Sequence, residues 1–281
     1  MAAGTGSLKA DRDAMTLPLP PMPRNVGSVN WIGLWTLYAR EVRRFVKVHQ
    51  QTVWAPVVTT LLYYAVFALS LGSAVRMVGE TPYLQFLAPG LIMMAMVQNA
   101  FANTSSSIVI AKVQGNIVDI LMPPLSPMEL VSGFVLGGVT RGIVVGLVTG
   151  LAIWAVIPMH MPHPGFVLFH AVMASMLLSL LGLVGGVWSE KFDNIAAVTN
   201  FVVTPLSFLS GTFYSVDTLP PVFWWIAHFD PFFYMIDGFR YGFIGVSDGA
   251  RWLGVAVMLG VNAGLWWLAW RMFKTGYKLK A

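Results

Sequence analysis

The sequence predicts an all-α polytopic membrane protein. Six transmembrane helices follow an N-terminal interfacial amphipathic helix, and a re-entrant outer segment lies between helices five and six. Of the 281 residues, 57% are apolar and only 10% are charged, whereas a soluble domain carries about 25% charged residues. The mean hydropathy is +0.70, and long uncharged stretches recur along the chain. This composition excludes an ordinary soluble enzyme and a disordered chain.

The N-terminal segment is the first element. Residues 1–30 lack the apolar run of a signal peptide and are proline-rich near LPLPPMPRN. We expect a disordered cytoplasmic tail over 1–30 and a single transmembrane domain over 31–281.

Residues 31–49 predict an amphipathic helix. Its apolar face holds Trp31, Leu34, Trp35, Tyr38, Val42, Phe45 and Val46. Four cations fall on the opposite face: Arg40, Arg43, Arg44 and Lys47. Such a helix lies in the membrane interface, with its aromatic side chains toward the acyl chains and its cations toward the headgroups. It either anchors the first span or also forms part of a partner-binding surface.

Uncharged stretches long enough to cross a bilayer define the spans. The six predicted spans are about 53–75, 85–108, 132–157, 166–188, 195–214 and 252–271. With both termini inside, thirteen Lys and Arg residues fall in inner segments and three in outer segments. The positive-inside rule therefore places both termini in the cytoplasm. This distribution also explains the net charge of +5 without a nucleic-acid partner.

The loop 109–131 is longer than a simple connector needs to be. It predicts a short helix with Val113, Ile117, Ile120 and Leu121 on one side, and the prolines at 123, 124 and 127 end that helix. Ser126 and Glu129 form a capping box for the next helix. The loop helix either docks a partner or packs on its own bundle.

Two motif regions resemble the ABC-2 type transport permeases. The first is Lys112…Gly115…Asp119-Ile-Leu121…Pro124-Leu-Ser-Pro127…Glu129. The second comprises Pro205–Tyr214, Leu219-Pro220, Asp230-Pro231-Phe-Phe-Tyr234 and Asp237-Gly-Phe-Arg240. The similarity covers about Trp31 to Lys280.

This resemblance implies the membrane half of an exporter in the bacterial cytoplasmic (inner) membrane. Two permeases, here a homodimer, would work with two copies of a separate cytoplasmic ATPase that binds ATP and Mg. The coupling helix would contact that ATPase and contains Lys112, Val113, Gly115, Ile117, Asp119, Ile120 and Leu121. The connecting helix would be Trp31–His49. Independently, the chain contains no G-x-x-x-x-G-K-[ST] phosphate loop, so an ATP-driven motor must be another chain.

Residues 213–243 hold twelve of the 37 aromatic residues, yet several acids and prolines prevent a clean additional span. We expect short helices that dip into the outer leaflet. They would form an outer gate, as the resemblance implies, or an aromatic belt that only anchors the bundle. The gate candidates are Phe213, Tyr214, Asp230, Asp237 and Arg240. Asp237 and Arg240 are three residues apart, a spacing that allows them to pair on one helical face.

Polar residues within the spans are the other candidates. Arg141 is either a functional intramembrane residue or a side chain that snorkels to the inner interface. Gln98, Asn99 and Asn103 are expected to face the bundle or a cavity rather than lipid. Glycines recur along span three with the spacing of close helix packing: Gly133, Gly137, Gly138, Gly142, Gly146 and Gly150.

No residue set points to enzyme chemistry on this chain. The three histidines His160, His163 and His170 have no nearby carboxylate, which favours loop residues over a metal site. Catalytic, cofactor-binding and metal-binding residues are therefore not predicted, and the partners expected are the ATPase, a second copy and membrane lipid. The rival interpretation is an ion-coupled carrier or an integral-membrane enzyme without an ATPase. The cargo stays open between a lipid, a glycan and a small amphiphile such as a drug.

Overall fold

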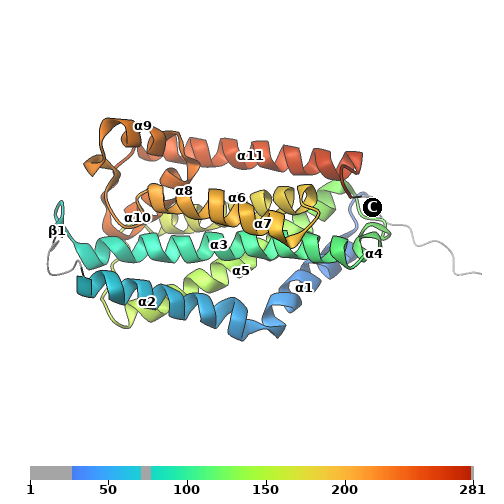
Figure 1. The fold of residues 1–281 in the computed structure, drawn as a ribbon, viewed down its shortest axis with the longest axis horizontal. Helices are drawn as coiled ribbons and strands as arrows, with labels where there is room; N and C mark the ends of the chain where they lie inside the picture. The colour runs from blue at the N-terminus through green and yellow to red at the C-terminus, as the bar shows by residue number, and fades with distance from the viewer. Residues whose placement is uncertain (1–26, 71–76, 280–281) are drawn as a thin grey trace, which may run out of the picture.

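The computed structural model describes residues 27–70 and 77–279, and within them the chain is a bundle of long helices (Figure 1). Six helical stretches there are long and apolar enough to cross a membrane, which confirms the six predicted spans. They are Gln50–Ser70, Tyr83–Val113, Pro127–Trp154, Pro164–Trp188, Phe192–Leu209 and Arg251–Thr275. The tail predicted over 1–30 lies outside the described residues except for 27–30.

The first and fifth spans each contain a π-helical turn. The first joins a turn at Gln50–Trp54 to α2 (Ala55–Ser70). The fifth joins α7 (Phe192–Val198), a turn at Thr199–Val203 and α8 (Thr204–Leu209). The others are the single helices α3 (Tyr83–Val113), α5 (Pro127–Trp154), α6 (Pro164–Trp188) and α11 (Arg251–Thr275).

Several helix ends differ from the predicted spans because capping groups, and not hydropathy, decide where a helix ends. The second span continues to Val113 and not 108. The third begins at Pro127 and not 132, since Ser126 caps it. The fifth ends at Leu209 and not 214, shortly before Gly211 adopts φ +80°.

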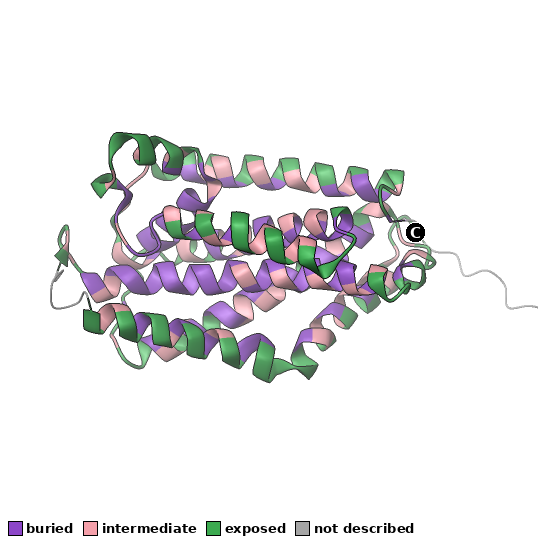
Figure 2. Ribbon diagram, viewed as in Figure 1, coloured by how far each residue is buried: buried purple, intermediate pink, exposed green. Residues whose placement is uncertain are grey.

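The helix α3 forms the centre of the bundle. In its most apolar stretch 83% of the residues are buried, against 11% in the fifth span and 22% in α11. Figure 2 shows α3 buried along most of its length, whereas α11 presents many exposed side chains. The fifth span and α11 therefore form the periphery, where apolar side chains would contact lipid.

The glycines of α5 allow its neighbours to approach closely. Gly133 lies against Leu37, Gly138 against Ser179 of α6, and Gly142 against the backbone of α3 at Met96. A side chain at these three positions would collide with its neighbour, which supports the packing role predicted for them.

Replacing Gly142 with leucine is expected to destabilise the bundle by about 1–3 kcal/mol. A Cβ atom there would lie 2.8 Å from Ser175 Oγ and 3.1 Å from the Met96 carbonyl oxygen. Thermal unfolding in detergent measures the effect, and Gly264→Leu is the matched control because nothing lies within 4 Å of a Cβ at that position. Equal melting temperatures for the two variants would contradict the packing argument.

The two ends of the bundle differ. One end, named here the α4 end, carries α4 (Ile117–Leu121) and the start of α1 (Trp31–Lys47) (Figure 1). The α9 end carries the hairpin β1 (Met77–Val78) and β2 (Thr81–Pro82), a 3-10 turn at Val216–Thr218, α9 (Pro221–Phe229) and α10 (Pro231–Ile244). The strands β1 and β2 pair antiparallel. Residues 232–242 of α10 are all buried, whereas α9 is mostly exposed.

Candidate functional site

The α4 helix is short and fixed at both ends. Gly115 ends the preceding helix α3 with a φ of +74°, and Pro123 and Pro124 follow α4. The predicted capping box then starts α5: the Ser126 backbone N–H donates to Glu129 Oε2 at 2.5 Å, and the Glu129 N–H donates to Ser126 Oγ at 3.3 Å. These constraints hold α4 as a defined unit at the surface of the bundle.

The two sides of α4 have different environments. Ile117 and Ile120 belong to the bundle core, with 3% and 6% of their surfaces exposed. Val118 and Met122 point outward, with 56% and 75% exposed. Leu121 is half-buried, and Asp119 is exposed. The exposed apolar side chains of α4 and its C-cap are therefore Val118 and Met122, which the sequence reasoning missed.

Lys112 lies in the last turn of α3 and binds the end of α6. Its Nζ donates to the carbonyl oxygens of Val187 at 2.8 Å and Ser189 at 2.6 Å. Lys278 Nζ contacts Glu190 Oε1 at 3.1 Å, and its hydrogen bond lowers the pKa of the Glu190 carboxyl below its usual range. Cations at a helix C-terminus satisfy carbonyls that have no partner within the helix. Lys112 therefore joins the C-terminal end of α3 to that of α6.

The start of α1 is tied to the same region. Asn30 is its N-cap and accepts from the Gly33 N–H at 2.9 Å. The Asn30 N–H donates to Glu129 Oε1 at 2.5 Å, and its side chain donates to the Pro124 carbonyl oxygen at 3.2 Å. The Glu129 carboxylate thus caps α5 and holds the start of α1, so it joins the proline elbow to α1.

The inner face of α1 differs from the predicted one. Leu37, Glu41 and Phe45 are buried and face the bundle, while Trp31 and Trp35 are 71% and 66% exposed. The expectation that Arg44 lies on the headgroup side is wrong, because its guanidinium reaches α3. Arg40, Arg43 and Lys47 are exposed. The exposed tryptophans still fit a helix that lies along a membrane surface.

Glu41 and Arg44 form the centre of a polar junction between α1 and α3, defined here as Glu41, Arg44, Asn103, Ser106 and Ser107. Glu41 Oε1 accepts from Ser107 Oγ at 2.8 Å, and its Oε2 lies 3.2 Å from Arg44 Nη2. Arg44 donates to the Asn103 carbonyl oxygen at 2.5 Å and to Ser106 Oγ at 3.0 Å. Glu41 is fully buried, whereas the Arg44 side chain is 28% exposed. Sequence reasoning missed Glu41.

Arg141 binds inside the bundle rather than toward a helix end. It lies 14 residues after Pro127, about 21 Å along α5. Its Nη2 donates to Asn99 Oδ1 of α3 at 2.8 Å. Of the two alternatives for Arg141, this geometry favours the intramembrane role over snorkelling.

A cleft of about 300 Å³ lies between α2 and the middle of α3. Amide and hydroxyl groups line part of it, from Gln51, Thr59, Thr60, Tyr63, Gln98 and Asn99. Because Asn99 also accepts the hydrogen bond from Arg141, the cleft and the guanidinium share one residue. Gln98 and Asn99 therefore face a cavity, and Asn103 is buried in the polar junction, as the sequence predicts.

The gate candidates at the α9 end are mostly buried. Asp230 caps α10 by accepting from the Phe232 N–H at 2.9 Å. The pair that the spacing of Asp237 and Arg240 allows does not form. Asp237 instead accepts from Ser247 and from the backbone of residues 248 and 249, while Arg240 donates to the Gly211 carbonyl oxygen at 2.5 Å and lies 3.8 Å above the Phe86 ring.

The two aromatic candidates lie beside that arginine site. Phe213 is buried and stacks on Phe67 with ring centroids 4.5 Å apart. Tyr214 is half-buried and donates to the Leu209 carbonyl oxygen at 2.9 Å. These contacts hold the end of the fifth span against α2 and α3.

The histidines do not come together. His160 lies in a loop, His163 caps α6, and His170 lies within α6 with its ring packed against Gly238 of α10. Within the described residues, no group of three His, Cys, Asp or Glu side chains is arranged to hold a metal ion.

Comparison with known proteins identifies the family. The profile of the ABC-2 type transporter family matches residues 33–244. The chain is 38% identical over 251 residues to the inner membrane transport permease YadH of Escherichia coli K12, covering 89% of this chain and 98% of that protein. It is 26% identical over 215 residues to nodulation protein J of Rhizobium leguminosarum bv. trifolii, covering 76% and 81%. The chain therefore belongs to the ABC-2 type transporter family and is a multi-pass membrane permease.

Proposed function

We propose that this permease exports an amphiphilic, lipid or glycan substrate and that a separate cytoplasmic ATPase supplies the energy. The observation that carries the proposal is the α4 end. There α4 exposes Val118 and Met122, and Glu129 ties the adjacent elbow to α1. If transport is driven by ATP, a chain without a phosphate loop needs a partner that hydrolyses it, and this surface is suited to receive one.

The working assembly we infer contains two copies of this chain and two ATPase subunits. ATP and Mg would bind on the ATPases and not on this chain. The α4 end would face the cytoplasm, in keeping with the many Lys and Arg residues in the segments assigned to that side. The sparsely buried fifth span offers an apolar face for a second copy or for lipid. The location would be the bacterial inner membrane.

The α2–α3 cleft is the candidate path for the polar part of the substrate. Its amides and hydroxyls, next to Arg141, suit a hydroxyl-bearing or anionic group at membrane depth. At the α9 end, α9 exposes Val222, Phe223, Trp225, Ile226 and Phe229, which fits contact with the outer leaflet. In this arrangement α10 and Arg240 would form the outer closure.

The rival function is an ion-coupled carrier, which needs no ATPase. The one fully buried carboxylate of the polar junction, Glu41, lies on α1 outside the six spans and contacts Arg44. A carboxylate that lies outside the spans and is paired with a guanidinium gives little support for ion coupling.

Affinity purification of the tagged permease from its native membrane in mild detergent tests the proposal. We expect an ATPase with a Walker motif to copurify at one copy per permease, and ATP-dependent movement of substrate into inverted vesicles. A permease that copurifies with no ATPase under several mild conditions would contradict the exporter and favour the ion-coupled carrier.

A further inference from the structure

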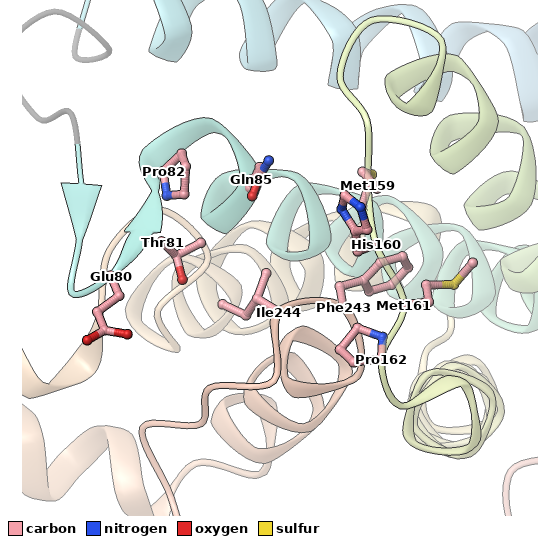
Figure 3. Close-up of a pocket in the computed structure, with 10 residues that line it drawn as sticks. All are labelled: Glu80, Thr81, Pro82, Gln85, Met159, His160, Met161, Pro162, Phe243 and Ile244. Carbon is pink, nitrogen blue, oxygen red and sulfur yellow. The ribbon is translucent and has the colours of Figure 1, made fainter.

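Two neighbouring cavities at the α9 end share lining residues. The first, named here the vestibule, has a volume of about 450 Å³ and is shown in Figure 3. The second, named here the groove, has a volume of about 240 Å³. Met159, Met161 and Phe243 line both cavities. A cavity that carries polar groups therefore lies next to an apolar one.

The groove is apolar and opens on the outer surface of the bundle. Gly146 and Gly150 of α5 make room for it, and Phe239 lies among its buried residues. Leu147 and Leu168 at its edges are 61% and 66% exposed. Because α5 and α6 are membrane spans, an opening between them faces the hydrocarbon of the bilayer. The occupant that this environment supplies is an acyl chain.

The vestibule carries the polar groups. Glu80 lies in the β1–β2 turn, Gln85 in the first turn of α3, and His160 in the loop before α6, so three separate segments surround the cavity (Figure 3). Among the ten lining residues that the structure describes, Glu80 is the acid, and none is Lys or Arg. A carboxylate attracts a cation and accepts hydrogen bonds from a primary ammonium, whereas a quaternary ammonium has no N–H to donate. The Gln85 amide can donate a hydrogen bond to a phosphate or ester oxygen.

We propose that the vestibule and groove together bind a phospholipid with a primary-amine headgroup, such as phosphatidylethanolamine. The ammonium would lie near Glu80, and one acyl chain would occupy the groove. The groove holds part of one chain only, and its open edge leaves the second chain in the bilayer. The site is therefore suited to a resident membrane lipid, and it does not depend on the ATPase partner.

Native mass spectrometry of the delipidated full-length permease with phosphatidylethanolamine, phosphatidylcholine and phosphatidylglycerol of identical acyl chains tests this site. The wild type should retain phosphatidylethanolamine about threefold more than the other two, the size expected of an exposed ion pair. Glu80→Gln should remove that preference without lowering total lipid retention. An unchanged preference in Glu80→Gln, or a wild type that retains the three lipids equally, would overturn the proposal.

The groove is tested by filling it. Gly150→Leu should lower retention of all three lipids about tenfold, because it displaces roughly two buried methylene groups. A Cβ at Gly150 lies 3.7 Å from Ile92 Cδ1, so the position tolerates a side chain. Gly260→Leu on the periphery of α11 is the control and should leave retention unchanged. A folded Gly150→Leu permease with normal lipid retention would show that the groove does not bind an acyl chain. The Glu80→Gln variant tests headgroup binding separately, even if Gly150→Leu does not fold.

Discussion

Replacing Val118 and Met122 together with aspartate is expected to abolish copurification of the ATPase and ATP-dependent transport, while the permease stays folded. Both side chains are exposed, so the substitution changes no core contact. In the assembly, each substitution would remove an apolar contact and bury a carboxylate without a partner. The loss of such a hot-spot contact weakens binding by about 2–4 kcal/mol. Quantitative copurification and vesicle transport measure the effect, and the thermal unfolding midpoint reports on the fold.

The control for this variant is a Val and Met pair at the other end of the molecule. Met77 and Val246 are 52% and 54% exposed, and their replacement by aspartate should leave ATPase binding unchanged. Ile117→Asp should instead lower the melting temperature, because it introduces a charge into the bundle core. Normal ATPase binding in the Val118 and Met122 variant would show that α4 is not the docking site.

The contrast between Ile117 and Val118 shows where sequence reasoning ends. The helix α4 has five residues, which is too short for apolar periodicity to separate an inner from an outer side. Its buried side is decided by a core cluster that also contains side chains of α3, α5, α6 and α11. The six spans were predictable for the opposite reason, since twenty consecutive uncharged residues have few alternatives to crossing a bilayer.

Side-chain pairs show the same division. The Ser126 and Glu129 capping box is local, and its spacing predicted it correctly. The spacing of Asp237 and Arg240 also permits a pair, but the loop 247–249 supplies backbone N–H donors to Asp237, and Gly211 supplies an acceptor to Arg240. Those competing partners come from tertiary structure, so the spacing alone gave the wrong partner.

The burial of Glu41 could have been predicted from the sequence. It stands at the middle of the series Leu37, Glu41 and Phe45, whose i, i+4 spacing puts an acid in line with two apolar side chains. An acid in an apolar row indicates a buried pair, and Arg44 one turn later is its partner. The sequence analysis instead assigned the apolar face from Trp31 and Trp35, which lie on another side of the helix.

Replacing Glu41 with leucine is expected to destabilise the permease by about 2–3 kcal/mol. The change removes the acceptor of Ser107 and leaves the Arg44 guanidinium without its carboxylate partner. Because Arg44 is 28% exposed and keeps its bonds to Asn103 and Ser106, the cost stays below that of a fully buried unpaired charge. Unfolding in mixed micelles, with Arg40→Met as an exposed control on the same helix, measures the difference.

The double variant Glu41→Leu with Arg44→Met separates the charge from the packing. If the unpaired guanidinium causes the loss, removing it should restore part of the stability, so the two substitutions are less than additive. Simple additivity would mean that Glu41 acts through Ser107 alone. Because Glu41 joins α1 to α3, and Glu129 joins α1 to the proline elbow, the single variant should also reduce coupled transport more than ATPase binding. A parallel loss of both would place Glu41 in folding only, and would leave Glu129 as the link between α4 and the spans.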